Sequence, residues 1–234
     1  MNPYNISISD KKLVAKNTWE LTLQCLETGT LNIKAGQYVR LVIPEIAGGT
    51  LENSRIFSAI LSSLMFRDRD SKHFGVVFRE SPSAFKQYLI NAPIGAQMLA
   101  HGPFGDFILP KQCLETGTLN IGWVAGGVGI APFLSMARYA TEEKLPYHIS
   151  LFYANMDKES AAYLPELAEL ERQNPNFSVQ LKFGVVDGEF LPVGDCRALD
   201  LVYIAGPMGM ADEVKKILAE IGVGSEKIKC EIFG

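Results

Sequence analysis

A cluster of glycines in the second half of the chain has the residue types and spacing to bind a phosphate. Gly126-Gly127-Val128-Gly129 directly follows the apolar run 121–125, which is typical of a buried parallel strand. Glycines at the end of such a strand let the backbone approach a pyrophosphate closely, and a following helix adds free N–H groups and its dipole. The residues that we expect to form this site are Gly126, Gly127, Gly129, Ile130, Ala131 and Pro132, the proline being tolerated in a first helical turn.

The glycine cluster alone does not establish a nucleotide site. Its spacing differs from the GxGxxG fingerprint of the common dehydrogenases. A tight strand-to-helix turn without a ligand could have the same composition. The interpretation therefore depends on the elements that surround the cluster.

Strand and helix patterns alternate around it. The expected strands are 121–125, 148–153, 179–183 and 201–205, and the expected helices are 130–142, 159–172 and 208–221. Such alternation predicts a doubly wound parallel sheet, in which ligands bind at the carboxyl ends of the strands.

The first half of the chain has a different pattern. Short alternating apolar segments, interrupted by turn residues such as Pro44 and Gly48-Gly49, predict six or so strands and one helix at 83–91. This pattern is typical of a small antiparallel β-barrel. A chain of 234 residues can form two domains, and we place them at residues 1–110 and 111–234.

Composition excludes a few classes of function. The net charge of −4 gives no general attraction to nucleic acid or anionic membranes. No apolar run reaches the ~18 residues of a membrane span, and the first twelve residues lack the apolar centre of a secretory signal. We therefore expect a cytoplasmic protein without a nucleic-acid partner or a membrane span.

The cysteines and one duplicated segment give no functional signal. Cys25, Cys113, Cys196 and Cys230 have no metal-ligand spacing, so we expect reduced thiols and no metal site. The decapeptide QCLETGTLNI occurs at 24–33 and again at 112–121. We expect both copies to enter a strand through Leu-Asn-Ile, and we assign no function to the duplication.

Several segments resemble, in order, the motifs of the ferredoxin–NADP reductase superfamily. This superfamily includes flavin reductases, cytochrome b5 reductases and reductase components of oxygenases, here expected without a ferredoxin domain. The matching segments are AGQYV at 35–39, RIFS at 55–58, GPFGDF at 102–107, the glycine cluster, AGPMGM at 205–210 and EIF at 231–233. The resemblance extends from about residue 6 to the end of the sequence, and it implies a flavin-binding barrel and a nicotinamide-nucleotide-binding α/β domain.

The resemblance assigns the flavin ring and its phosphate to the segment 55–58. Arg55 would neutralise the phosphate. Ile56 and Phe57 would lie along the ring, with Phe57 standing where Tyr is commoner. The Ser58 hydroxyl would lie near N5, the flavin atom that accepts the hydride.

A second phosphate-binding segment departs from the family pattern. Lys86 stands where Ser or Thr is usual. Either Lys86 supplies a positive charge, or Ser83 caps the helix and backbone N–H groups bind the phosphate. This leaves both FAD and FMN open, and we favour FAD because it is commoner in the family.

The nicotinamide would bind at the loop 205–210. Ala205 stands where the family usually has Cys, but the flavin carries out the redox chemistry, so a thiol is not required. Phe233 would cover the flavin face that the nicotinamide approaches, and Glu231 would belong to a proton or hydrogen-bond network. The loop residues assigned to the site are Ala205, Gly206, Pro207 and Met210.

Two positions favour NADH over NADPH. Phe152-Tyr153-Ala154-Asn155 resembles the FAN segment of NADH-using cytochrome b5 reductases and makes Asn155 a candidate ligand. Asp187 stands where those enzymes carry an Asp that repels a 2′-phosphate. We therefore expect NADH as the preferred substrate and NADPH as the alternative.

The implied function is that of an NADH-dependent flavin oxidoreductase. Ser58, Glu231 and Phe233 are its candidate catalytic residues. Electrons would leave to a separate ferredoxin, cytochrome or oxygenase. Two alternatives are a reductase of free flavin or small molecules, and a non-catalytic flavin- or nucleotide-binding subunit of a larger redox complex.

Overall fold

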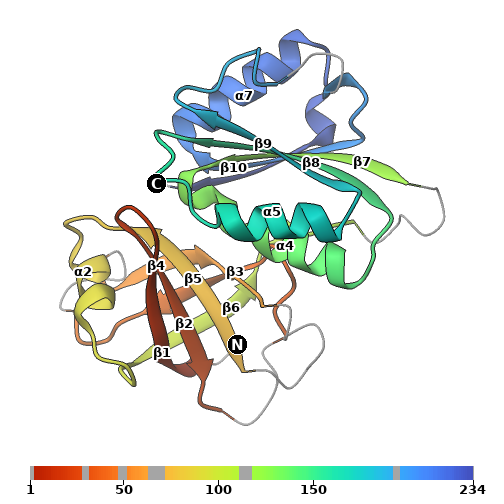
Figure 1. The fold of residues 1–234 in the computed structure, drawn as a ribbon. Coiled ribbons are helices and arrows are strands. Elements are labelled where there is room, and N and C mark those ends of the chain that lie inside the picture. The colour runs from red at the N-terminus through yellow and green to blue at the C-terminus, as the bar shows by residue number, and fades with distance from the viewer. Residues whose placement is uncertain are drawn as a thin grey trace.

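The chain folds around two sheets that share no strand among the described residues (Figure 1). The computed structural model describes residues 3–27, 32–46, 52–62, 72–110, 118–191 and 196–233. The last strand of the first sheet ends at Phe104 and the first strand of the second begins at Leu119. Residue 110, where we place the domain boundary, lies between them.

The first sheet is antiparallel and closes on itself. Its strand order is β4-β3-β6-β1-β2-β5. Ile60, just after β4, pairs with Gly75 of β5 through N–H···O bonds of 2.8 and 2.7 Å. Because β4 and β5 are the outer strands, this bridge completes the predicted barrel. The strands are β1 (Tyr4–Ala15), β2 (Thr18–Cys25), β3 (Tyr38–Val42), β4 (Ser54–Ser58), β5 (His73–Arg79) and β6 (Gln97–Phe104), and the helix α2 (Ala84–Asn91) follows β5.

The second sheet is parallel, with the order β11-β10-β7-β8-β9. Figure 1 shows α7 on one face of this sheet and α4 and α5 on the other, toward the barrel. The predicted doubly wound α/β fold is therefore confirmed. The strands are β7 (Leu119–Gly126), β8 (Tyr147–Asn155), β9 (Phe177–Phe183), β10 (Leu201–Pro207) and β11 (Ile228–Phe233), and the helices are α4 (Ile130–Glu142), α5 (Leu164–Gln173) and α7 (Met208–Glu220).

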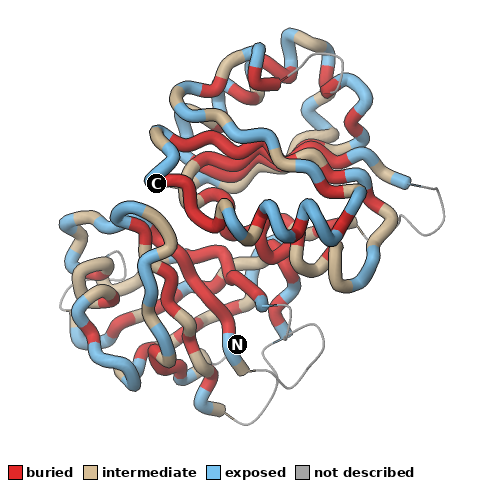
Figure 2. Tube along the Cα trace, viewed as in Figure 1, coloured by how far each residue is buried: buried red, intermediate tan, exposed pale blue. Residues whose placement is uncertain are grey.

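The buried residues follow the central strands of both sheets (Figure 2). Trp123 on β7 is fully buried and stacks on Phe133 of α4, with ring centroids 5.3 Å apart. This contact attaches α4 to the sheet through apolar area and ring geometry. In the parts of the chain that the structure describes, no helix has the length and apolar character needed to cross a membrane.

Two expectations about local structure are wrong. The helix expected from residue 159 begins at Leu164, because Asp157 and Ser160 form a turn through a 2.8 Å bond and Tyr163 is left-handed (φ 64°). The first decapeptide copy does not enter a strand at Asn32, whereas the second enters β7 at Leu119. Residues 28–31 and 112–117 of the copies lie outside the described residues.

Hydrogen bonds between α4 and the segment after β4 join the two domains. The Ser135 hydroxyl is fully buried, accepts a bond from the Leu61 N–H at 2.9 Å and donates to the Ala59 carbonyl at 2.7 Å. Arg138 donates to the Leu61 carbonyl at 2.9 Å and pairs with Glu166 at 2.6 and 2.9 Å. We name Ser135, Arg138 and their partners the interdomain clamp. It fixes the barrel relative to the parallel sheet.

Candidate nucleotide and flavin site

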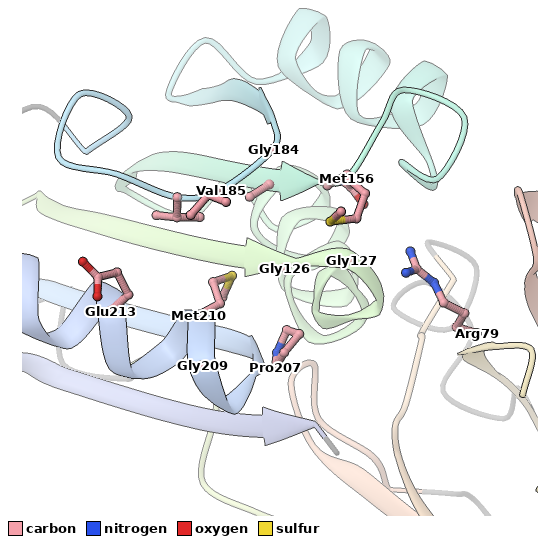
Figure 3. A pocket seen from close by; sticks show the side chains of 13 residues that line it. Arg79, Gly126, Gly127, Met156, Gly184, Val185, Pro207, Gly209, Met210 and Glu213 are labelled. Carbon is pink, nitrogen blue, oxygen red and sulfur yellow. The ribbon is translucent and has the colours of Figure 1, made fainter.

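A pocket of about 370 Å³ opens at the carboxyl ends of β7, β8, β9 and β10 (Figure 3). This is the edge where the sequence predicts ligand binding. Many of the predicted residues line it directly, namely Gly126, Gly127, Asn155, Pro207 and Met210. The other residues of this segment do not line the pocket: Gly129 is buried in the turn before α4, and Ile130, Ala131 and Pro132 are buried in its first turn.

The glycine turn has the shape that its composition predicts. Gly127 has a φ of +53°, in the left-handed region that favours glycine. A Cβ at Gly129 would overlap the backbone carbonyl of Ala205 and lie 2.9 Å from the Cα of Gly206. The turn can therefore pack directly against the end of β10 only because residue 129 has no side chain.

Asn155 carries unsatisfied polar atoms at the pocket wall. Both polar atoms of its carboxamide are buried without a hydrogen-bond partner of good geometry among the described residues. The neighbouring Tyr153 hydroxyl donates to the Gly127 carbonyl at 3.3 Å and accepts from the Ala162 N–H at 3.1 Å. Burial raises the pKa of Tyr153 to about 12, against a smaller lowering by its contact with the Asn155 side chain. Buried polar groups are seldom left without partners. The Asn155 amide therefore has hydrogen-bonding capacity left for a ligand with donor and acceptor groups of its own.

Ala205 does not line the pocket. It is fully buried in the core and pairs with Ala125 and Glu231 on the neighbouring strands. Gly206 follows it at the same strand end, and Pro207 is the neighbour that lines the pocket.

Asp187 lies outside the lining residues and is already paired. Its carboxylate accepts a bond from Lys182 at 2.7 Å and another from the Phe190 N–H at 3.0 Å. These bonds, the Lys182 bond foremost, lower its pKa. Its predicted role in repelling a 2′-phosphate stays a prediction, but much of its charge is compensated by Lys182.

Ser58 and Glu231 come together although they are far apart in the sequence. Ser58 ends β4 in the barrel, Glu231 lies in β11 of the parallel sheet, and the Ser58 hydroxyl donates to Glu231 Oε2 at 3.3 Å. Burial raises the pKa of Glu231 from 4.5 to about 7, against a smaller lowering by the Ser58 bond. A carboxyl group with this pKa can hold or release a proton near neutral pH.

The strand before Ser58 presents two different faces. Phe57 is buried between Phe78 and Phe85, with both ring centroids 6.1 Å away, and the Arg55 guanidinium lies 5.7 Å from the centroid of Phe85. Ile56 points the other way and is 51% exposed. Ile56 therefore has exposed apolar surface on which a ring could pack, whereas Phe57 has little exposed surface.

Positive charge and an orphaned hydroxyl gather at the start of α2. The pKa of Lys86 is lowered by burial first, and then by the charges of Arg55 and Arg79. Ser83 makes no side-chain cap, contrary to one of the two expectations, and its buried Oγ has no hydrogen-bond partner among the described residues. Three cations and a free hydroxyl at a helix N-terminus form an environment for an anion.

Phe233 ends β11, opposite Pro207 of β10 in the parallel register. Its side chain is partly buried and packs against the core. It therefore lies beside a lining residue of the pocket, two positions beyond Glu231 on the same face of the strand.

Sequence reasoning missed two charged residues that line the pocket in the described part of the chain. Arg79, the last residue of β5, reaches the pocket from the barrel, and Glu213 lines it from α7. Figure 3 shows these two side chains at opposite ends of the pocket. Neither belongs to a motif, and no local pattern separates them from ordinary exposed charges.

Comparisons with known proteins agree with this geometry. Residues 123–216 match the family model of the oxidoreductase NAD-binding domain. The reductase component of propane 2-monooxygenase from Rhodococcus jostii is 26% identical over 239 residues, covering 94% of this chain and 60% of that protein. NADH-cytochrome b5 reductase 1 from Coccidioides immitis is 24% identical over 244 residues, covering 93% and 74%.

Other similar proteins extend this picture. Flavohemoprotein A from Dictyostelium discoideum is 28% identical over 151 residues, 62% of this chain and 37% of that protein. The solved FAD/NAD-binding domain of a nitric oxide dioxygenase from Vibrio cholerae is 19% identical, and the two chains cover each other fully with a TM-score of 0.80. The chain thus spans 37% and 60% of the length of the flavohemoprotein and the propane monooxygenase component.

The chain combines a closed antiparallel barrel with a parallel sheet that has a pocket at its strand ends, and the parallel-sheet part contains the region matched by the oxidoreductase NAD-binding domain. These matches support the resemblance to the ferredoxin–NADP reductase superfamily that the sequence motifs predict.

Proposed function

We propose that the protein takes a hydride from NADH, transfers it to a bound flavin, preferably FAD, and passes the electrons to a separate acceptor. In this proposal the barrel domain, residues 1–110, binds the flavin, and the α/β domain, residues 111–234, binds the nicotinamide nucleotide. NADPH is the weaker substrate and FMN the alternative cofactor. The cytoplasmic location is part of the same proposal.

The observation that carries the proposal is the Ser58–Glu231 pair. The pair joins the two domains with a 3.3 Å hydrogen bond. Glu231 lies on β11 two residues before Phe233, which pairs with the pocket residue Pro207. A ring bound along β4 would therefore meet a nicotinamide that enters from the pocket. The redox centre is expected where the two domains meet.

The residues of the barrel fit a flavin phosphate. The orphaned Ser83 hydroxyl and the N-terminus of α2 offer hydrogen-bond donors, and Lys86 and Arg55 offer positive charge. The pKa of Lys86 is lowered by burial and then by the charges of Arg55 and Arg79, and an anion beside Lys86 would act against this lowering. This arrangement favours the first expectation, in which Lys86 supplies the charge.

A flavin bound there would accept the hydride from nicotinamide and supply electrons to the acceptor. Gly127 and the start of α4 would hold the pyrophosphate of the dinucleotide. Phe233 would cover the ring until the nicotinamide arrives, and the interdomain clamp would keep the two binding sites in register. Glu231, through Ser58, would hold or release a proton at the Ser58 hydroxyl near neutral pH.

The relatives suggest the class of acceptor. The R. jostii protein is by its name the reductase component of an oxygenase, and the C. immitis protein acts by its name on cytochrome b5. We extend this to a separate redox protein as the acceptor here. Reduction of free flavin or small molecules is tested in the same experiment.

The test is anaerobic mixing of the FAD- or FMN-loaded protein with NADH. We expect rapid loss of the visible absorbance of the flavin, and faster reduction by NADH than by NADPH. Reoxidation by added ferredoxin, cytochrome or free FMN then identifies the acceptor class. A protein that binds neither flavin contradicts the proposal, and a loaded protein that NADH does not bleach supports the non-catalytic alternative.

A further inference from the structure

The nucleotide pocket carries two opposite charges that lie far apart within it. Among the described residues that line it, Arg79 and Glu213 alone are charged, and they occupy opposite ends (Figure 3). Arg79 lies toward Gly127 at the end of β7, where the glycine turn begins. Glu213 lies on the first turns of α7, facing the segment that follows β9. A dinucleotide in this pocket therefore meets a different charge at each end.

The orientation of the dinucleotide follows from the fixed points of the site. The glycine turn and the N-terminus of α4 take the pyrophosphate, and the Ser58–Glu231 pair marks the nicotinamide end. The adenosine then extends in the opposite direction, along the part of the pocket lined by Val185 and Met210 and closed by Glu213. Apolar side chains on either side of a slot suit a flat base. Glu213 therefore lies at the adenosine end.

The Glu213 carboxylate is available to interact with a ligand, whereas the Asp187 carboxylate is already paired. Lys182 binds the Asp187 carboxylate at 2.7 Å, and Asp187 does not line the pocket. Within the described ranges, the structure gives Glu213 neither a hydrogen bond nor an ion pair with another residue. Among the described residues, no ion pair therefore holds its carboxylate at the pocket wall.

We infer that Glu213 is the residue that selects NADH against NADPH, an inference that rests on the proposed function. The two coenzymes differ only by a phosphate on the 2′-hydroxyl of the adenosine ribose, which adds a charge of ~−1.5 to −2 near neutral pH. A carboxylate at the same end of the pocket repels that phosphate and leaves the ribose hydroxyl of NADH unaffected. The specificity of the site thus comes from a helix residue that no family motif contains.

The test compares Glu213→Gln and Glu213→Lys with the wild type. We expect the ratio of kcat/KM for NADPH to that for NADH to rise about fivefold in Glu213→Gln and further in Glu213→Lys, because the exposed position is screened by water and salt. The gain should shrink as salt is added. The kcat/KM for NADH should change little.

Two further variants separate Glu213 from its neighbours. Asp212→Asn removes an exposed carboxylate from the same turn of α7 that does not line the pocket, and the coenzyme ratio should stay at the wild-type value. Asp187→Asn tests the paired carboxylate. A shift in Asp187→Asn or Asp212→Asn without one in Glu213→Gln overturns the inference, as does a coenzyme ratio in Glu213→Gln equal to that of the wild type.

A binding measurement separates this inference from the proposed function. The dissociation constants of 2′,5′-ADP and 5′-ADP are measured by calorimetry with the full chain, without turnover. A larger fall in the dissociation constant of 2′,5′-ADP than in that of 5′-ADP in Glu213→Gln supports the inference, even if NADH fails to reduce the flavin. Equal changes for both ligands overturn it even if the protein is an active reductase.

Discussion

The two halves of the site are built from different parts of the polypeptide. On the nucleotide side, glycines shape the turn at the strand ends, where Gly126 and Gly127 line the pocket and Gly129 packs against the backbone of Ala205 and Gly206. On the barrel side, side chains carry the chemistry, through Ser58 and the cationic group around Lys86. The difference teaches that a motif of glycines specifies a shape, whereas a motif of polar residues specifies chemistry only together with its partners.

The largest effect is expected from adding one methyl group to the glycine turn on the nucleotide side. Gly129→Ala places a Cβ against the backbone of Ala205 and Gly206, which cannot move aside as a flexible side chain could. We expect a loss of about 3 kcal/mol or more in the free energy of unfolding and loss of nucleotide binding. Urea unfolding and NADH titration measure both.

Gly188→Ala is the matched control, because nothing lies within 4 Å of a Cβ at that position. Its unfolding and NADH affinity should stay near the wild-type values. If Gly129→Ala behaves like this control, close packing of the glycine turn is not what shapes the nucleotide side.

Arg79 tests whether backbone alone holds the phosphates. Removing its charge in Arg79→Gln should weaken NADH binding about tenfold, the value of one charge-assisted hydrogen bond at an exposed position. The loss should diminish at high salt. Arg172→Gln, an exposed arginine on α5 that pairs with Glu169, is the control. Unchanged affinity in Arg79→Gln would mean that backbone groups suffice, which would make the contrast between the halves still sharper.

The side-chain half is tested by pH. Burial raises the pKa of Glu231 to about 7 in the folded protein, so the folded chain holds a proton that the unfolded chain releases above pH ~4.5. Wild-type stability should therefore fall as the pH rises from ~4.5 through ~7. Glu231→Gln should remove this fall and exceed the wild type by about 1–2 kcal/mol above pH ~8, with allowance for solvent screening.

Removing the hydrogen bond from Ser58 gives a second test of the Ser58–Glu231 pair. Because this bond lowers the pKa of Glu231, Ser58→Ala should move the midpoint of the stability change, and of any pH dependence of flavin reduction, to higher pH. Glu220→Gln, an exposed carboxylate at the end of α7, should leave both midpoints unchanged. Equal pH profiles for the wild type and Glu231→Gln would show that Glu231 does not titrate in this range.

The sequence predicted the backbone half of the site better than the charges around it. Gly127 requires a left-handed φ and Gly129 a close approach, so the residue type itself carries the structural information. Arg79 and Glu213 are exposed charged residues. Their position at the pocket depends on tertiary packing, which the neighbouring sequence does not indicate. The pairing of Asp187 with Lys182 could likewise not be predicted from the sequence, because the two side chains meet only through the path of the chain after β9.

The duplicated decapeptide shows the same limit for secondary structure. Identical residues are irregular at Asn32 and Ile33 but extended in β7 at Asn120 and Ile121. Only the second copy has strands β8 and β10 beside it. Strand formation is therefore decided by the neighbours that the fold supplies, and not by local preference.

The interdomain clamp has a consequence for how such proteins can be recombined. The Ser135 hydroxyl is fully buried and uses the Ala59 carbonyl and the Leu61 N–H as its partners. In a chimera, a foreign barrel whose chain follows another path after β4 leaves these groups unsatisfied in the interface, at a cost of about 1–3 kcal/mol for each. Exchange of domains between relatives should therefore succeed when residues 59–61 and α4 are transplanted together. The unit that can be exchanged is then defined by this contact and not by the domain boundary.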